Sequence, residues 1–309
     1  MARASEFEEL RPLLFSIAYR ILGSVSEAED AVQDSWLRYE ATSAEPASPR
    51  AFLSATVARI SIDVLRSARR RRETYVGPWF PEPLLTDPYE DPQRSAELAD
   101  TVSMAALLLL ERLSPLERAV FVLREVFGFG EIASAVGRSE AACRQLAVRA
   151  RRHMDEGRPR FEAGRREREE LAGRFFEAFR EGDVDGLQEL LAADVYMVSD
   201  GGGKAPNWNR ISGAPNVARL LGAVVPVFGT IGMVVEQCEV NGQPGAIFRD
   251  REGKVLGTMA LDILGGRIQA IRSVNNPDKL GHLGPVADAW AVARQASEAR
   301  RSAGLFFRP

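Results

Sequence analysis

The chain has 309 residues, of which 45% are hydrophobic and 27% are charged, and its formal net charge is −3. This composition predicts a globular protein with room for about two or three domains, and the slightly acidic balance excludes a uniformly basic nucleic-acid coat. The two cysteines and the two histidines lie in different segments, so we expect no disulfide framework, no metal site and no cofactor. A reducing cytoplasm is the default location.

The sequence also predicts no contact with a membrane. Its acidic N-terminal stretch lacks the apolar core of a signal peptide. The longest apolar run, from Met104 to Leu110, is much too short to span a bilayer.

Charge is segregated along the chain. Residues 1–58 carry nine acidic and five basic side chains, whereas residues 59–72 carry six arginines and one Asp. Residues 73–111 carry eight acidic side chains and one Arg, and residues 138–168 carry ten arginines and five acidic side chains. Such alternation predicts DNA-facing and protein-facing surfaces on one chain.

The first two predicted elements are helices. Residues 6–23 place apolar side chains at helical spacing on one face, and Gly23 ends the run. The next helix has Ser26 as its predicted N-cap and carries Val32 and Trp36 on its apolar face. Its other face has four acidic side chains within eight residues, which fit either a solvated face or a docking surface for a basic partner helix.

A loop and a long basic helix follow. Residues 42–50 contain proline and serine and are predicted to form the loop, and the helix then runs from about Ala51 to Arg72. Its C-terminal part, residues 59–72, holds six arginines. A cationic helix end complements the helix dipole, but six arginines exceed what the dipole requires, so we favour contact with phosphates.

Residues 75–103 are acidic and contain five prolines, which predicts a linker rather than a domain. The run from Trp79 to Pro83 (WFPEP) is unusual for a linker, because exposed aromatic side chains beside proline generally dock on another surface. We expect this run to pack on another part of the protein or on a partner, the alternative being a plain solvated linker.

Residues 129–152 predict two short helices around a tight turn. The first helix has an apolar stripe that ends at Gly137, and Ser139 can cap the second helix. The second helix is expected to bury Ala142, Cys143 and Ala147. Its exposed side carries Arg144, Gln145, Arg149, Arg151 and Arg152.

This arrangement is typical of a helix-turn-helix, whose second helix enters the major groove of DNA. The alternative is a basic amphipathic helix pair in an ordinary bundle, because short helix-turn-helix patterns also occur by chance. The segments that precede these two helices in the chain help to decide between a DNA-binding helix-turn-helix and an ordinary helix pair.

Three segments together resemble an extracytoplasmic-function sigma factor of bacterial RNA polymerase. They are AEDAVQDSWLR, PRAFLSATVARISIDVLRS and the helix-turn-helix at residues 129–152. Their order and spacing carry the resemblance: a four-helix-type module, a linker, and a second module that ends in a helix-turn-helix. The resemblance implies a non-enzymatic promoter-specificity subunit whose partners are core RNA polymerase and promoter DNA.

The resemblance also implies site residues. The acidic helix would dock on the polymerase clamp through Glu29, Asp30, Gln33, Asp34 and Trp36. Residues 42–50 would hold a flipped base of the −10 element, beside a DNA-facing helix that contributes Arg59, Asp63, Arg66, Arg69 and Arg70. The module from Leu113 to Arg152 would read the −35 element through Ser139, Glu140, Arg144, Gln145, Arg149, Arg151 and Arg152. The acidic linker would lie in a basic channel near the polymerase active site and the RNA exit.

The second helix of the helix-turn-helix departs from the family pattern. Members commonly have a basic residue and then Leu where Leu146 and Ala147 stand, so the groove-facing side is less sharply defined here. Cys143 occupies a position that is usually Val. We interpret it as a core thiol, the alternative being a redox sensor.

After about residue 170 the pattern changes to that of a third domain. Two helices, Glu169–Glu181 and Asp185–Ala192, precede strand-like runs, and a helix at about Ala214–Val225 interrupts the strands. The runs are Asp194–Ser199, Met233–Val240, Ala246–Arg249, Val255–Leu264 and Arg267–Val274, with hairpin-turn signals at Asn241-Gly242 and Gly265-Gly266. This layout predicts an α+β domain with a curved antiparallel sheet, and it resembles a SnoaL-like cone of the ketosteroid-isomerase type.

Three short segments extend the resemblance to a sigma-J-type subgroup that carries a SnoaL-like extension. They are Trp79-Phe80-Pro81-Glu82-Pro83, Asp200-Gly201-Gly202-Gly203-Lys204 and Asn276-Pro277-Asp278-Lys279-Leu280. In that subgroup the extension is thought to modulate sigma activity in place of a separate anti-sigma protein. The resemblance therefore implies that these segments make interdomain, regulatory contacts.

The glycine run of Asp200–Lys204 is not a Walker loop, because Val198 and Ala205 stand where that motif requires Gly and then Ser or Thr. We interpret it as a contact loop in which the glycines permit positive φ angles and close approach of the backbone. Lys204 would be available to a carboxylate.

A SnoaL-like fold raises the alternative of an enzyme. Tyr196, Asp200 and Asp262 could lie inside such a cone, where a buried Asp could act as a base. The domain has a single Tyr, and its one His, His282, lies in the tail, so we expect no enzymatic activity. Binding of an unknown small molecule in the pocket stays open.

We predict the following organisation: residues 1–74 form a region-two-like helical domain, 75–104 an acidic linker, 105–155 a region-four-like helix-turn-helix domain, 156–168 a charged connector, 169–276 the SnoaL-like domain and 277–309 a tail with a helix at about Val286–Arg301. Two rival functions remain open at this stage. One is a ligand-sensing DNA-binding regulator, and the other is a simple dimeric repressor, which leaves the acidic helix and the acidic linker unexplained.

Overall fold

The computed structural model describes residues 2–43, 45–72, 74–89, 101–129, 132–155, 164–208 and 210–302. The chain divides into two compact units. The helical unit comprises residues 1–74 and 86–158, and the C-terminal unit comprises residues 75–85 and 159–309. Part of the predicted linker, Tyr75–Leu85, therefore packs with the C-terminal unit.

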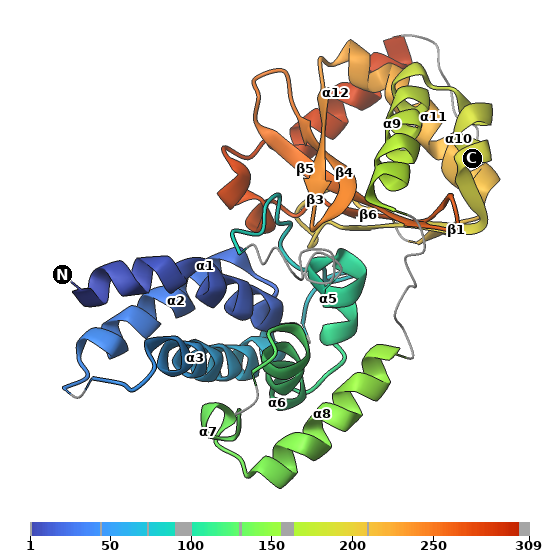
Figure 1. Cartoon of the computed structure of the whole chain (residues 1–309). Coiled ribbons are helices and arrows are strands. Elements are labelled where there is room, and N and C mark those ends of the chain that lie inside the picture. The colour runs from blue at the N-terminus through green and yellow to red at the C-terminus, as the bar shows by residue number, and fades with distance from the viewer. Residues whose placement is uncertain are drawn as a thin grey trace. The chain divides into compact units, whose positions relative to one another are not determined.

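The helical unit begins with three packed helices, α1 (Ala2–Leu22), α2 (Val25–Glu40) and α3 (Pro49–Arg72) (Figure 1). Apolar side chains at helical spacing, such as Leu14, Ile17 and Val57, have no exposed surface and form its core. These helices were predicted from the sequence, but the predicted cap of α2 was wrong. Ser24, not Ser26, is the N-cap, because its side chain accepts a hydrogen bond from the Glu27 N–H at 3.1 Å.

The second part of the helical unit contains shorter elements. They are α5 (Met104–Leu110), α6 (Pro115–Phe121), the π-helical turn η1 (Val122–Val126), α7 (Ala133–Val136) and α8 (Glu140–Asp155). A capping box starts α6, in which Ser114 and Glu117 satisfy each other's backbone N–H groups. Gly137 ends α7 at φ 63°, a left-handed conformation that favours glycine, and the chain turns there into α8.

The helices α7 and α8 form the predicted helix-turn-helix. The Ser139 side chain accepts a hydrogen bond from the Ala142 N–H at 3.3 Å, as expected of a cap. Cys143 and Ala147 are buried as predicted, but Ala142 is only partly buried and Leu146 is buried instead. The buried stripe of α8 is therefore rotated slightly from the predicted one. Burial raises the pKa of the Cys143 thiol, which fits a core position.

The C-terminal unit is built from a sheet and a helical layer. Its helices are α9 (Arg165–Glu181), α10 (Val184–Leu190), α11 (Ala214–Thr230) and α12 (Ala289–Ser302). Its strands are β1 (Leu191–Asp200), β2 (Ile211–Ser212), β3 (Val234–Val240), β4 (Gln243–Arg249), β5 (Val255–Leu264) and β6 (Arg267–Val274). Among the described residues the strands form a six-stranded sheet in the order β2-β1-β6-β5-β4-β3.

The sheet is mixed. The strands β3 to β6 form an antiparallel meander, and Asn241 adopts φ 54° at the predicted Asn-Gly turn between β3 and β4. The first strand, β1, instead pairs with β6 in parallel, so the sheet is not wholly antiparallel as expected. The predicted fold class, helical modules followed by an α+β domain, is confirmed.

One face of the sheet packs against α9, α10 and α11 (Figure 1). The core there contains three phenylalanines of α9, Phe175, Phe176 and Phe179, which contact one another at ring-centroid distances of 5.2 and 6.2 Å. Leu261 and Ile271 come from the central strands β5 and β6. Residues on the opposite face at the strand ends, including Asp200, are also buried. On that face Asp200 binds residues of the linker segment and of the loop after β6.

Candidate functional site

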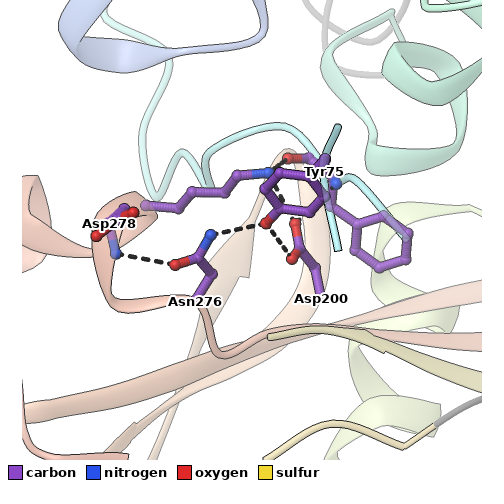
Figure 2. Close-up of polar contacts among 6 residues, drawn as sticks. Tyr75, Asp200, Asn276 and Asp278 are labelled. Carbon is purple, nitrogen blue, oxygen red and sulfur yellow. Dashed lines mark hydrogen bonds and ion pairs between the residues drawn. The ribbon is translucent and has the colours of Figure 1, made fainter. Parts of the chain in front are cut away.

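The three short segments singled out in the sequence meet at one place in the C-terminal unit. The linker segment Tyr75–Leu85 lies against the end of β1 and the loop that follows β6. We call this contact the linker clasp and define it by Tyr75–Leu85 and the residues that bind this segment, namely Asp200, Asn241, Asn276, Lys279 and His282. Figure 2 shows the polar groups at its centre.

Asp200 is the centre of the clasp. It ends β1 and has no exposed surface, so its carboxylate must be satisfied by protein groups. It accepts hydrogen bonds from the Tyr75 hydroxyl at 2.5 Å and from the Phe80 backbone N–H at 2.9 Å. The Lys279 ammonium lies 2.7 Å away and provides the opposite charge. Two of these three donors come from the linker segment, so the buried charge depends on the linker being in place.

Lys279 fixes the aromatic part of the segment. Its ammonium also donates to the Phe80 backbone carbonyl, and it lies 4.8 Å from the Tyr75 ring centroid and 4.3 Å from that of Trp79. Lys279 is 7% exposed, and a largely desolvated ammonium interacts strongly with aromatic faces. One cation therefore binds the carboxylate and two rings of the linker at once.

Asn276 completes the polar centre. Its side-chain amide donates to the Tyr75 hydroxyl at 2.7 Å, and its side-chain oxygen accepts from the Asp278 backbone N–H at 3.1 Å (Figure 2). Burial and the hydrogen bond to Asp200 raise the pKa of the Tyr75 hydroxyl well above its ordinary value. The tyrosine therefore remains a neutral donor to the carboxylate at physiological pH.

The glycine run after Asp200 makes room for the linker. Gly202 has φ 58°, and a Cβ at that position would lie 2.8 Å from the Tyr75 hydroxyl and 2.3 Å from the Asn276 amide. A Cβ at Gly203 would lie 3.3 Å from Val76. Glycine is required at Gly202 both for its backbone conformation and for this close approach. Beyond the run, Lys204 pairs with Asp278 at 2.6 Å, the exposed ion pair that the sequence suggested.

A second anchor holds the far end of the segment. Leu84 donates its N–H to the Asn241 side-chain oxygen at 3.2 Å and accepts from the Asn241 N–H at 2.6 Å. Pro83 accepts from the His282 ring at 2.7 Å. Asp200 ends β1, whereas Asn241 lies in the β3–β4 turn, at the opposite end of the strands and near the other edge of the sheet. The segment therefore runs across the sheet between its two anchors. Its buried side chains include Phe80 and Leu84.

The residues that the resemblance assigned to polymerase binding lie on α2. Glu29, Asp30, Gln33 and Asp34 are exposed and share one side of the helix. Trp36 differs from them because it is partly buried, with its ring centroid 5.0 Å from that of Phe7 and 6.3 Å from that of Tyr39.

The arginine helix α3 contacts the helix-turn-helix within the helical unit. Arg59 donates hydrogen bonds to the backbone carbonyls of Ser134 and Ala135, at 2.5 and 3.0 Å, near the C-terminal end of α7. Asp63 and Arg66 are exposed and pair with each other at 3.2 Å. The side chains of Arg69 and Arg70 lie outside the described part of the chain.

The outer side of α8 carries the predicted DNA-reading residues. Arg144 and Gln145 are exposed, and Arg144 lies 3.6 Å from Glu140 one turn before it. Two other arginines pair with acidic side chains of the preceding elements: Arg149 with Glu117 at 2.9 Å and Arg151 with Glu125 at 2.5 Å. Burial opposes ionisation of Glu117, but donors from Ser114 and Arg149 outweigh it and lower its pKa. Arg152 is exposed on the last turns of the helix.

The acids proposed for an enzyme pocket do not line the cavity of the C-terminal unit. Asp200 is engaged by the linker, and Asp262 pairs with Arg272, which also donates to the Tyr196 hydroxyl at 2.6 Å. The cavity between the sheet and α11 and α12 has none of the three among its lining residues. Strand alternation explains this, because all three side chains point to the other face of the sheet.

Comparison with known proteins identifies the helical modules. Residues 7–71 match the family model for Sigma-70 region 2, and residues 103–154 match the model for Sigma-70, region 4. The chain is 39% identical over 288 residues to the ECF RNA polymerase sigma factor SigJ of Mycobacterium tuberculosis, with 89% of this chain and 92% of that protein covered. The chain belongs to the ECF RNA polymerase sigma factors.

Other relatives agree with this assignment. The sigma factor is 32% identical over 279 residues to a probable ECF RNA polymerase sigma factor, SigI, of Mycobacterium tuberculosis, covering 88% of this chain and 93% of that protein. The crystal structure of SigJ superposes with a TM-score of 0.69 at 35% identity and covers 90% of this chain and 98% of that chain. These alignments cover 88–90% of the chain and therefore extend into the C-terminal unit.

As an ECF sigma factor, the protein directs transcription initiation and is not an enzyme. No helix in the described part of the chain is long and apolar enough to cross a membrane.

Sequence reasoning found most of the clasp but missed three of its members. Tyr75, Asn241 and His282 were not proposed as contact residues, although all three bind across the clasp. Tyr75 could have been noticed, because an aromatic residue just before the WFPEP run extends the same docking surface. Asn241 was read only as a turn former, and no sequence signal pointed to His282.

Proposed function

We propose that this sigma factor binds core RNA polymerase through the exposed acidic face of α2 and promoter DNA through α3, the 42–50 loop and α8. The charges support this division. Glu29, Asp30 and Asp34 form an acidic patch suited to a basic partner helix, whereas Arg144 and Gln145 are exposed where the second helix of a helix-turn-helix reaches base edges. The −10 element would be held by the first module and the −35 element by the second.

We further propose that the C-terminal unit restrains the sigma factor through the linker clasp. The linker is the segment expected to enter the polymerase, and its residues Tyr75–Leu85 are bound at two anchors by Asp200 and Asn241. Departure of the segment would remove two of the donors that satisfy the buried Asp200 carboxylate, from the Tyr75 hydroxyl and the Phe80 N–H, which is unfavourable. Release of the clasp would therefore be a step that precedes productive use of the linker.

The contact of Arg59 supports a second restraint within the helical unit. In the free protein this side chain binds the carbonyls at the end of α7, where a cation also complements the helix dipole. The same side chain cannot contact DNA at that time. Promoter binding would accordingly require α3 and the helix-turn-helix to separate.

The test is run-off transcription with purified core polymerase on the promoter upstream of the protein's own gene. The Lys279→Met variant removes the cation of the clasp, and Lys204→Met, which breaks only the exposed pair with Asp278, is its matched control. We expect more transcript from Lys279→Met than from the wild type and no change from Lys204→Met. Equal output from the wild type and Lys279→Met, with core binding intact, would refute the restraint. Lower output from Lys279→Met would mean that the clasp activates the sigma factor and does not restrain it.

A chain that ends at Gly164 tests the proposed polymerase and promoter binding by the helical modules separately from the proposed restraint by the clasp. It retains both helical modules and lacks the main part of the C-terminal unit. Transcription by this chain would support the assignment of polymerase and promoter binding to the helical modules. Loss of core binding in the shortened chain would contradict that assignment and leave the clasp experiment to be judged separately.

A further inference from the structure

The C-terminal unit contains a cavity that the linker clasp does not use. It has a volume of about 270 Å³ and lies between the sheet, α11 and α12. Its walls are apolar, with large side chains that include Met197, Trp208, Leu221, Phe248 and Met259. Sites for drug-sized ligands usually measure about 300–1,000 Å³, so this one suits a smaller molecule.

The helix α12 closes the cavity with small side chains. Ala289, Ala293 and Ala296 face it together with Val292 and Ser297, at the spacing of one helical face. Larger residues at these positions would fill the space and improve packing, because unfilled cavities weaken a core. The small side chains on this face of α12 therefore keep the cavity open, although filling it would stabilise the fold.

One end of the cavity is polar. Ser273 and Asn275 lie at the end of β6 and line it, and the Asn275 backbone is fixed by a hydrogen bond of 2.8 Å from its N–H to the Asp200 carbonyl. A Cβ at Gly257 would lie 2.5 Å from the Asn275 side-chain oxygen, so glycine leaves the space that this amide occupies. Neither side chain has a hydrogen-bond partner among the residues that the structure describes. A ligand with a donor or acceptor could bind there.

The lining residues carry no charge. The described residues around the cavity include no Asp, Glu, Lys, Arg or His, and no Cys or Tyr. A charged ligand would lose its hydration without gaining a counter-charge, which is strongly unfavourable. General acid–base chemistry would also lack a suitable side chain, and the two lining serines would lack a base to activate them as nucleophiles. The cavity is thus built for binding and not for turnover.

We propose that this cavity binds a small, uncharged, largely apolar molecule with one hydrogen-bonding group, and that α12 is its lid. The apolar body of the ligand would lie against Met197, Phe248 and Met259, with its polar group toward Ser273 and Asn275. The proposed ligand site does not depend on polymerase or DNA binding. An experiment can therefore refute the ligand site without refuting the proposed function.

Two fluorescent probes of the same ring skeleton test the proposal on the full-length protein. N-phenyl-1-naphthylamine is neutral and apolar, and 1-anilinonaphthalene-8-sulfonate adds one negative charge. Titration with the neutral probe should give saturable fluorescence enhancement. The sulfonate should bind at least about tenfold more weakly, because the cavity offers no counter-charge. Absence of enhancement with the neutral probe, or equal affinity for both, would overturn the proposal.

Cavity-filling variants locate the bound probe. Ala293→Phe fills the space from α12, and Ala291→Phe, on the same helix but not lining the cavity, is the matched control. Leu220→Trp fills the cavity from α11, at a partly exposed position that tolerates a larger side chain. Because this substitution is not on α12, it distinguishes filling of the cavity from a displacement of α12 by Ala293→Phe. We expect at least about tenfold weaker probe binding in both filling variants and no change in the control. Unchanged binding in Ala293→Phe and Leu220→Trp would refute the site.

Discussion

At the scale of single residues, the chemistry of the clasp depends on one buried carboxylate. Asp200 has no exposed surface and is neutralised by Lys279, while Tyr75 and the Phe80 N–H satisfy its remaining lone pairs. Removal of one partner from such a buried pair typically costs about 3–5 kcal/mol, because the other charge is left uncompensated. The linker segment adds two hydrogen bonds to this pair, from the Tyr75 hydroxyl and the Phe80 N–H.

The raised pKa of Tyr75 predicts a pH dependence at alkaline pH. Its hydroxyl stays protonated in the folded protein above its ordinary pKa of 10.0, whereas in the unfolded chain it ionises there. The stability it contributes is therefore fully present below that value and is lost as the pH rises through it toward the folded pKa.

Thermal unfolding of the wild type and Tyr75→Phe, from about pH 8 to about pH 10.5, measures this effect. The stability advantage of the wild type should shrink toward the alkaline end, since phenylalanine cannot ionise. A constant difference between the two proteins would contradict the prediction.

The arginines of α8 should divide into two classes. Arg144 pairs only loosely with Glu140 and is free to reach a base edge, so Arg144→Ala should relax discrimination at the −35 element by roughly 1–3 kcal/mol. Arg151 is held by Glu125 and would contact phosphate, so Arg151→Ala should weaken binding to all sequences alike and lower the salt slope by about one. Holoenzyme binding to matched and mismatched promoters at several salt concentrations distinguishes the two, and identical profiles would refute the division.

At the scale of elements, helix ends are set by particular capping side chains. Ser24 accepts from the Glu27 N–H at the start of α2, Ser114 and Glu117 form the capping box of α6, and Ser139 caps α8. The position of the α2 cap matters because it sets which residues of this helix belong to its first turn. The acidic face proposed to bind polymerase begins at Glu29, about one turn after the cap.

The cap of α2 is tested by a pair of substitutions. Ser24→Ala removes the acceptor of the Glu27 N–H and should lower the free energy of unfolding by about 1 kcal/mol. Ser26→Ala removes a contact with the Ser24 hydroxyl but leaves the acceptor of the Glu27 N–H in place, so it should have the smaller effect. Denaturant unfolding curves measure both values, and equal effects would mean that Ser24 is not the effective cap.

At the scale of the whole molecule, the chain order and the structural units differ. The linker segment Tyr75–Leu85 lies between the two sigma modules in sequence but packs with the C-terminal unit. The next residues belong to the helical unit, where Asp87 pairs with the buried Arg20 at 2.9 Å. A linker with each part bound to a different unit is a suitable element for communication between them.

Amide hydrogen exchange tests whether the clasp behaves as one cooperative element. Asp200→Asn weakens the first anchor, at Phe80, and leaves the second anchor, between Leu84 and Asn241, chemically intact. We expect faster exchange at both Phe80 and Leu84, because a segment bound at two points loosens as a unit. Faster exchange at Phe80 alone would indicate two independent anchors.

Much of this protein could be predicted from local sequence. Helical periodicity, the alternation of apolar and polar residues and the Asn-Gly and Gly-Gly turns identified most helices and strands, because these signals depend on residues near one another in the chain. The spacing of the helical modules identified the family. The unusual composition of WFPEP, DGGGK and NPDKL marked the contact segments before their partners were known.

Only the tertiary structure decided how these pieces meet. The parallel pairing of β1 with β6, the face of the sheet on which Asp200, Asp262 and Tyr196 lie, and the capture of Leu84 by Asn241 all join residues distant in sequence. A strand pattern shows that side chains alternate, but which face receives the linker and which encloses the cavity depends on what packs against each. The sequence by itself determined the elements and the family, and long-range packing determined that the acids hold the linker and leave the cavity uncharged.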